Sequence, residues 1–225
     1  MRVYSLISAL VTITSISACA SRDLNLSRSI FSPAPAGLVN VGLPGAFCTG
    51  VQIDERRALT AAHCLYNKDG SGVVNAKSIH VVREADIAPV NNQVLSSEML
   101  PGFEIGLRTV ENINYDVAVL TFSDAVPGNF PTLNISDGPM QLGERVVTSY
   151  YKNVGSNFYL VEANCSVLNR KKSVLVLDCP IDFGASGAPV YRVMREGASA
   201  LVAIIVAKAM WRNRPVALAV NVGSV

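Results

Sequence analysis

Residues 59–64 read Leu-Thr-Ala-Ala-His-Cys, and this stretch decides how the rest of the chain is interpreted. It follows a charged turn at residues 54–57, and Cys48 lies in the apolar run before that turn. A disulfide between Cys48 and Cys64 would hold the loop that carries His63, and closing a loop of that size stabilises a fold by about 3 kcal/mol. His63 can act as a general base, because imidazole has an unperturbed pKa of about 6.5. A hydrogen-bonded core histidine is the alternative that this stretch leaves open.

Two further stretches carry side chains that can act together with His63. Asp116 opens the apolar run 116–120, where a buried carboxylate needs hydrogen-bond partners and an imidazole N–H is one of them. Residues 184–189 read Gly-Ala-Ser-Gly-Ala-Pro, so small neighbours leave the Ser186 hydroxyl accessible. Adjacent backbone N–H groups there can point into a common space. Taken separately, each stretch is better explained as ordinary structure, an aspartate that ends a turn and a tight turn of small residues.

Together the three stretches occur in the order His, Asp, Ser, and they resemble the trypsin/chymotrypsin-like serine peptidases, a double-β-barrel family. The resemblance covers essentially all of residues 38–225. Leu-Thr-Ala-Ala-His-Cys is its most specific motif, and Cys48-Thr49-Gly50 is a second anchor. Asp-Val-Ala-Val-Leu at 116–120 and Gly-Ala-Ser-Gly-Ala-Pro at 184–189 complete it.

The resemblance assigns a role to each of these residues. It implies that Ser186 is the nucleophile and that His63 is the general base and then the general acid. It implies that Asp116 orients and stabilises the imidazolium. The backbone N–H groups of Gly184 and Ser186 would form the oxyanion hole. The expected activity is therefore that of a serine endopeptidase.

The chain departs from the animal digestive members of that family. Ala185 stands where those members carry an aspartate, and residues 38–42 lack the Ile-Val-Gly-Gly terminus that pairs with it. We therefore expect no ion-pair zymogen switch, and a closer likeness to bacterial members such as the glutamyl endopeptidase type. The usual acid position for cleavage after basic residues holds Pro180, although Asp182 lies near it. Lys208 either favours an acidic substrate or points into solvent, so the cleavage specificity stays open.

Short apolar or alternating runs separated by Gly, Pro, Asn and Asp predict an all-β fold. The strands are predicted at Ala46–Ile53, Arg57–Thr60, Ser78–Val82, Val117–Phe122, Arg145–Tyr151, Phe158–Ser166, Ser173–Leu177, Ala188–Arg192, Leu201–Val206 and Val216–Val222. A short helical piece is predicted at residues 61–65. The expected architecture is two six-stranded antiparallel β-barrels packed with the active site in the cleft between them. A linker-like stretch at 123–143 places the first barrel at about 38–125 and the second at about 141–225.

The N-terminus predicts export. Arg2 is followed by an uncharged, largely apolar run and by small residues suitable for cleavage, so we expect residues 1–18 to be a signal peptide. The context of Cys19 resembles the bacterial lipobox, and residues 19–37 would then be a tether between lipid and domain. Ala18-Cys19-Ala20 also fits simple secretion. We expect a periplasmic or outer-membrane lipoprotein of a bacterium, with a secreted protein as the alternative.

The cysteine count agrees with that expectation. Five cysteines in an exported chain leave one unpaired. Cys48 with Cys64 and Cys165 with Cys179 are plausible bridges, the second because its cysteines flank an apparent hairpin. Cys19 is then the odd cysteine, and lipidation would account for it.

Composition narrows the partners. Half of the residues are hydrophobic, 16% are charged and the formal net charge is +2, which indicates a globular protein. Arg170–Lys172 is the longest basic run, so no nucleic-acid partner is expected. No metal or other cofactor is expected either, because the only other histidine, His80, lies in an unlike context and is interpreted as structural. We expect a monomer that acts on protein or peptide substrates and meets a membrane only through its lipid. A catalytically inactive scaffold lipoprotein on the same fold is the alternative function.

Overall fold

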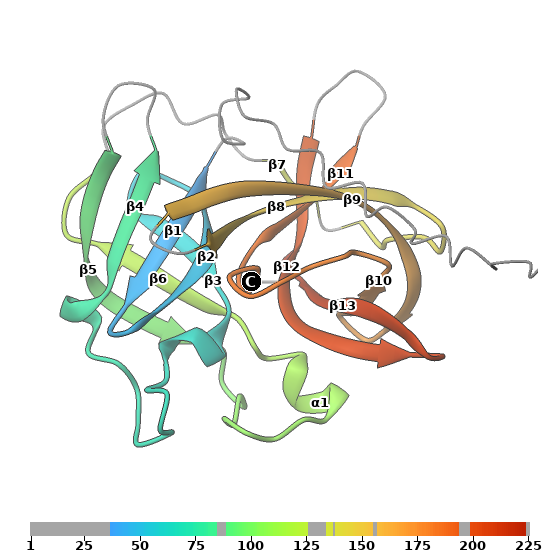
Figure 1. The fold of residues 1–225 in the computed structure, drawn as a ribbon, viewed down its shortest axis with the longest axis horizontal. Coiled ribbons are helices and arrows are strands. Elements are labelled where there is room, and N and C mark those ends of the chain that lie inside the picture. Colours follow the sequence, from blue (N-terminus) through green and yellow to red (C-terminus); the bar gives the residue numbers. More distant parts are fainter. Residues whose placement is uncertain are drawn as a thin grey trace, which may run out of the picture.

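The computed structural model describes residues 37–84, 89–125, 134–136, 138–154, 157–193 and 199–223. The predicted signal peptide, Cys19 and all but the last residue of the tether lie outside these ranges. The described chain is all-β and forms two closed six-stranded antiparallel barrels that lie side by side (Figure 1), as predicted. Across these ranges, no helix has both the length and the apolar character needed to cross a membrane.

The first barrel is built from the N-terminal strands. They are β1 (Leu38–Leu43), β2 (Ala46–Gln52), β3 (Arg57–Thr60), β4 (His80–Glu84), β5 (Pro89–Met99) and β6 (Ala118–Phe122). They close in the order β1-β2-β3-β6-β5-β4, so the last strand pairs with the first. Residues on β6 alternate between buried and half-buried, as expected where successive side chains point to opposite faces of a sheet. Val41, Leu59 and Leu120 are among the side chains that fill the interior.

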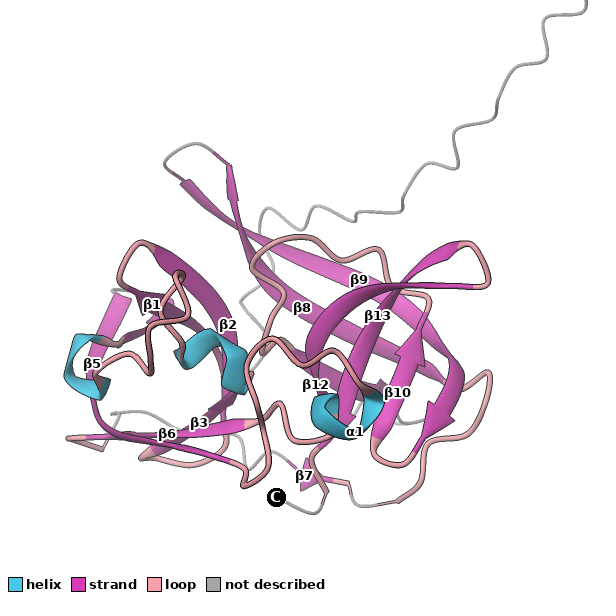
Figure 2. Cartoon of the chain, turned by 90° about the horizontal axis from the view of Figure 1, so that it is seen from below, coloured by secondary structure: helices cyan, strands magenta, loops and turns pink. Residues whose placement is uncertain are grey.

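The second barrel follows the same plan. Its strands are β8 (Arg145–Val154), β9 (Asn157–Lys171), β10 (Val174–Leu177), β11 (Pro189–Val193), β12 (Ser199–Trp211) and β13 (Arg214–Asn221). They run in the order β11-β8-β9-β10-β13-β12, and pairing of β11 with β12 closes the barrel. The short strand β7 (Asn134–Ile135) adds to β12 in parallel. Figure 2 shows the β8–β9 hairpin extending beyond the barrel wall.

Helical structure is short and lies in the connections. Two 3₁₀ helices cover Ala62–Leu65 and Ala76–Ser78, and α1 covers Val110–Ile113. The Thr109 hydroxyl caps α1 by accepting from the backbone N–H of Asn112. The Asn114 side chain accepts from the backbone N–H of Ser173 at 3.1 Å, so the segment after α1 is attached to the second barrel.

Three strands escaped the sequence prediction, namely β1, β5 and β7. Asn40 and Gly42 interrupt the apolar pattern of β1, and polar residues at 91–93 do so in β5. Both strands are stabilised by backbone pairing on each side, β1 with β2 and β4, and β5 with β4 and β6. Barrel closure therefore supplies partners that local alternation does not reveal.

The two barrels are joined through backbone and apolar contacts. The N–H of Thr49 on β2 donates to the carbonyl of Ser186 at 2.9 Å, and the N–H of Tyr151 on β8 donates to the Thr49 hydroxyl at 3.0 Å. Ile204 and Val220 of the second barrel pack into the apolar cluster of the first. These contacts fix the loops of one barrel against those of the other.

Candidate active site

His63 lies in the short 3₁₀ helix that follows β3. The buried residues Ala62 and Leu65 anchor this turn in the first barrel, and a disulfide joins Cys64 to Cys48 on β2. The segment closed by this disulfide therefore includes β3, the β2–β3 turn and His63. The imidazole itself is 30% exposed, so it is fixed at its base and open on one side.

Asp116 is placed directly before β6 and is almost fully buried, with 5% of its surface exposed. One carboxylate oxygen accepts from the backbone N–H of His63, and the other lies 2.8 Å from Nδ1 of the same residue. Because both bonds go to one residue, the carboxylate fixes the position and the rotation of the imidazole together. It also favours the tautomer that carries its proton on Nδ1 and leaves Nε2 free to accept.

Ser186 comes from the second barrel, in the loop before β11. Its hydroxyl oxygen lies 2.9 Å from Nε2 of His63. Gly184 and Gly187 on either side have φ values of 95° and 80°, which favour glycine. A Cβ on Gly184 would overlap the Tyr151 carbonyl and the Phe47 ring. The loop therefore depends on small residues to bring Ser186 against the first barrel.

The backbone of this loop leaves two N–H groups without a protein acceptor in the described ranges, those of Gly184 and Ser186. The neighbouring N–H groups are all used: Ala185 donates to the Asp182 carbonyl at 3.2 Å and Gly187 to the Ile205 carbonyl at 2.7 Å. Gly184 and Ser186 are both half-buried. Two donors without a protein acceptor, two residues apart and beside a hydroxyl, can stabilise a developing oxyanion.

A charged cluster surrounds the approach to the loop. Asp182 pairs with Lys152 of β8 at 2.7 Å and with Lys208 of β12 at 3.4 Å. The bond from Lys152 is the main reason that the pKa of Asp182 falls to about 2. The Lys208 ammonium also lies 5.3 Å from the ring centre of Phe183, which is 85% exposed. The sequence analysis left two alternatives for Lys208, contact with an acidic substrate or exposure to solvent. In the structure its side chain is 51% exposed and also contacts Asp182.

The second disulfide joins Cys165 on β9 to Cys179, just after β10. Asp178 supports the same connection by accepting from the N–H of Ser166. The bridge therefore anchors the segment that leads from β10 to the Ser186 loop. Two disulfides in one domain are typical of proteins that fold in an oxidising compartment, and they indicate an exported protein.

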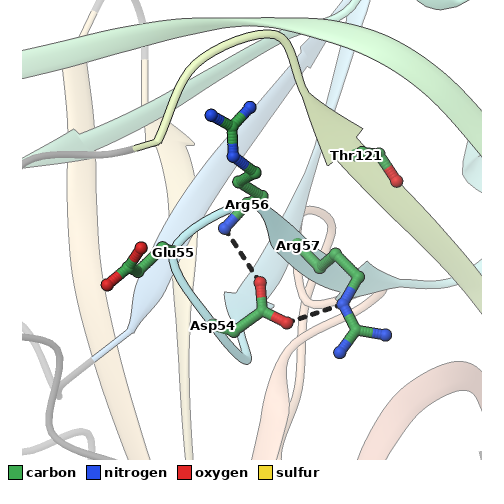
Figure 3. A pocket seen from close by; sticks show the side chains of 5 residues that line it. All are labelled: Asp54, Glu55, Arg56, Arg57 and Thr121. Atoms are coloured by element: carbon green, nitrogen blue, oxygen red, sulfur yellow. Dashed lines mark hydrogen bonds and ion pairs between the residues drawn. The ribbon is translucent and has the colours of Figure 1, made fainter.

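Other candidate positions lie apart from these residues. His80 begins β4 and is exposed, where it pairs with Gly42 and Gln93 through the backbone. A hollow of about 580 Å³ opens at the β2–β3 turn and is lined by Asp54, Glu55, Arg56, Arg57 and Thr121 (Figure 3). Asp54 binds the backbone N–H of Arg56 and pairs with the guanidinium of Arg57, while the Arg56 guanidinium donates to the Ser123 carbonyl. Within the described ranges, no group of three or more His, Cys, Asp or Glu side chains is arranged to hold a metal ion.

The sequence analysis assigned no role to Thr49. Thr49 served only as part of the Cys-Thr-Gly motif, yet its backbone and side chain bind Ser186, Gly184 and Tyr151. No local signal marks it, since a threonine in a strand is ordinary.

Comparisons with known proteins agree with the double-barrel fold. A family model described as the trypsin-like peptidase domain matches residues 48–204. Serine protease 23 of Rattus norvegicus is 27% identical over 165 residues, which cover 64% of this chain and 42% of that protein. Coagulation factor IX of Oryctolagus cuniculus is 27% identical over 132 residues, which cover 59% of this chain and 44% of that protein. The chain thus spans less than half the length of these curated relatives.

Proposed function

Because the chain belongs to the family of trypsin-like peptidase domains, we propose that it is a serine endopeptidase that works through an acyl-enzyme. The observation that carries the proposal is the continuous series Asp116–His63–Ser186, with contacts of 2.8 Å and 2.9 Å. A serine hydroxyl is a weak nucleophile until a positioned base takes its proton. The series provides such a base, and it provides the buried carboxylate that holds the base in place.

In the proposed reaction, the Ser186 oxygen attacks the carbonyl carbon of the scissile peptide bond and its proton passes to Nε2 of His63. Negative charge develops on the former carbonyl oxygen, which the N–H groups of Gly184 and Ser186 bind. The C–N bond then breaks, and His63 returns its proton to the leaving amine. A water molecule repeats the sequence on the acyl-enzyme, releasing the acid and restoring the Ser186 hydroxyl. Asp116 keeps its charge throughout and stabilises the imidazolium.

Labelling with a fluorophosphonate tests the proposal, since this probe reacts covalently with activated serines. The wild-type protein should be labelled, and Ser186→Ala should not. Ser71→Ala serves as the matched control, because Ser71 lies in an exposed loop and bonds only within it. A folded wild-type protein that takes no label would instead favour the inactive scaffold. A cleavage profile against a peptide library would then define the substrates.

We propose further that the protein is closer to bacterial family members and needs no proteolytic activation. Ala185 is buried, with 1% of its surface exposed, and carries no charge that a new N-terminus could pair with. Treatment with an activating protease should therefore leave the labelling rate unchanged. A large rise in labelling after such a cut would contradict this.

For localisation, we propose that the exported protein is a bacterial lipoprotein anchored through Cys19, acting as a monomer on protein or peptide substrates. The lipobox-like context of Cys19 and the odd cysteine count support it. Mass spectrometry of the mature N-terminus should find diacylglycerol on Cys19, and Cys19→Ser should abolish it. An unmodified mature chain that begins at Ser21 would show secretion instead.

A further inference from the structure

Thr49 makes four hydrogen bonds at the junction of the two barrels. It is fully buried on β2. Its hydroxyl donates to the Gly184 carbonyl at 2.7 Å and accepts from the N–H of Tyr151 at 3.0 Å. Its own N–H donates to the Ser186 carbonyl at 2.9 Å, and its carbonyl accepts from the Thr60 hydroxyl at 2.9 Å. Every polar group of this residue is therefore satisfied, and two of the bonds end on the nucleophile loop.

These two bonds hold the Gly184–Ala185 peptide and the Ser186–Gly187 peptide. The hydroxyl fixes the Gly184 carbonyl, and the main-chain N–H fixes the Ser186 carbonyl. The Ala185 N–H holds the Gly184–Ala185 peptide as well, by donating to the Asp182 carbonyl at 3.2 Å. The Gly184 N–H lies in the preceding peptide, on the other side of a Cα with a φ of 95°. If Thr49 released the carbonyl, Gly184 could leave this conformation, because glycine has wide access to backbone dihedral angles. The conformation of Gly184, and with it the direction of its N–H, is therefore supported by a side chain from the other barrel.

Among the described residues, no charged side chain has this task. Ala185 is small and apolar, and the Asp182 carboxylate binds Lys152, Lys208 and the N–H of Phe183 rather than the Gly184 carbonyl. A buried neutral hydrogen bond is costly to leave unmade, because the Gly184 carbonyl would lose the partner that Thr49 provides. Thr49 is therefore well suited to hold the loop in a single conformation without a covalent or ionic switch.

We propose that Thr49 is a positioning residue. By binding the Gly184 carbonyl, its hydroxyl keeps Gly184 in the conformation in which the Gly184 N–H can bind an oxyanion. This inference rests on the proposed peptidase function. Because Thr49 belongs to the first barrel and Gly184 to the second, catalysis would then depend on how the two barrels pack. The backbone bond from Thr49 to Ser186 survives any substitution other than proline, so the side chain alone can be tested.

The test compares Thr49→Val, which removes only the hydroxyl, with Thr49→Ser, which keeps it. The probe is a fluorophosphonate, whose phosphoryl oxygen would occupy the oxyanion site, and both its maximal labelling rate and its apparent affinity are measured. In Thr49→Val the maximal rate should fall about ten- to a hundredfold, less than the roughly 10²–10³-fold cost of losing an oxyanion donor outright. Apparent affinity should stay within about twofold, because the bond acts in the transition state.

Thr49→Ser should recover the maximal rate to within about threefold, because it restores the bond. Thr148→Val is the matched control, since Thr148 is a fully buried threonine of β8 whose hydroxyl has no partner among the described residues. It should label like the wild type. If Thr49→Val does not fold, Thr49→Ala is compared with Thr49→Ser in the same labelling assay.

A Thr49→Val protein that labels at the wild-type rate would overturn the positioning role while leaving the peptidase function intact. Equal losses in Thr49→Val and Thr49→Ser would overturn it as well, because they would point to packing. If the wild type takes no label, the peptidase function fails, and amide hydrogen exchange of residues 181–190 decides on Thr49. Faster exchange there in Thr49→Val than in Thr49→Ser supports the positioning of the loop, and equal exchange refutes it.

Discussion

Replacing Asp116 by asparagine tests the geometry around His63 with a minimal change of shape. The carboxylate accepts two bonds from one residue, at the backbone N–H and at Nδ1, both 2.8 Å long. Asparagine has only one acceptor oxygen, and the fixed backbone N–H of His63 must keep it. The amide NH₂ then faces Nδ1, which becomes an acceptor, and the ring proton moves to Nε2. Nε2 lies 2.9 Å from the Ser186 oxygen and can no longer accept its proton.

The expected loss is large and separable from any loss of stability. The wrong tautomer lowers the rate about 10⁴-fold in the Ser-His-Asp template, which corresponds to about 5.4 kcal/mol of activation free energy. Exchanging a charge-assisted bond for a neutral one changes the free energy of unfolding by only about 1 kcal/mol. Such a change lowers Tm by roughly 2–4 °C for a chain of this length.

The assay is the fluorophosphonate labelling rate, measured beside a thermal melt. Asp54→Asn is the matched control, because Asp54 also binds one backbone N–H, of Arg56, and one side-chain N–H, of Arg57, but at the exposed β2–β3 turn. It should label like the wild type. If Asp116→Asn stays folded and labels within about tenfold of the wild type, the tautomer argument is wrong.

Three further predictions concern the support of the site. Replacing Cys48 and Cys64 by alanine should lower the free energy of unfolding by about 3 kcal/mol and Tm by roughly 6–12 °C, measured by calorimetry; an unchanged Tm would contradict it. Gly187→Ala should destabilise the fold by at least about 2 kcal/mol in denaturant titration and abolish labelling, because a Cβ would overlap the Thr49 carbonyl and the residue has a φ of 80°; a stable, active variant would refute this. The pKa of Asp182 is lowered from 3.8 to about 2 chiefly by Lys152, so its contribution to stability is present above pH 3.8 and is lost as the pH falls through 2. Thermal melts should therefore show Asp182→Asn less stable than the wild type at pH 6, with a difference that has largely disappeared at pH 2, and a difference independent of pH would count against the ion pair.

Much of the fold followed from local patterns. The apolar strands β2, β3, β6 and β10 were recognised because their side chains alternate or run continuously between turn residues. Strand β5 was missed because polar residues at 91–93 interrupt its apolar pattern, and β7 because two residues carry no pattern. Both form through pairing with strands that are distant in sequence, which local periodicity cannot report.

Some residues of the candidate site were likewise recognisable from local sequence, and others were not. His63, Asp116 and Ser186 were recognised from the short motifs around them, and the structure places them within hydrogen-bonding distance of one another across separations of 53 and 123 residues. Thr49 was overlooked because its partner Gly184 lies 135 residues away and no motif connects them. The pairing of Lys208 with Asp182 was missed for a similar reason, since β12 and the nucleophile loop meet only in the closed barrel.

The sequence by itself determined which side chains can do chemistry and which segments extend as strands, because both depend on residue type and near neighbours. Small residues at 184–188 and the cysteines were readable in the same way. Only the tertiary structure decided that the N–H groups of Gly184 and Ser186 have no protein acceptor in the described ranges and that Thr49 binds the carbonyls of these two residues. That outcome depends on closing two barrels and packing them together, where the Thr49 hydroxyl of one barrel is buried against the backbone of the other. Burial makes each such bond costly to lose, and so the packing of the barrels sets the geometry of the site.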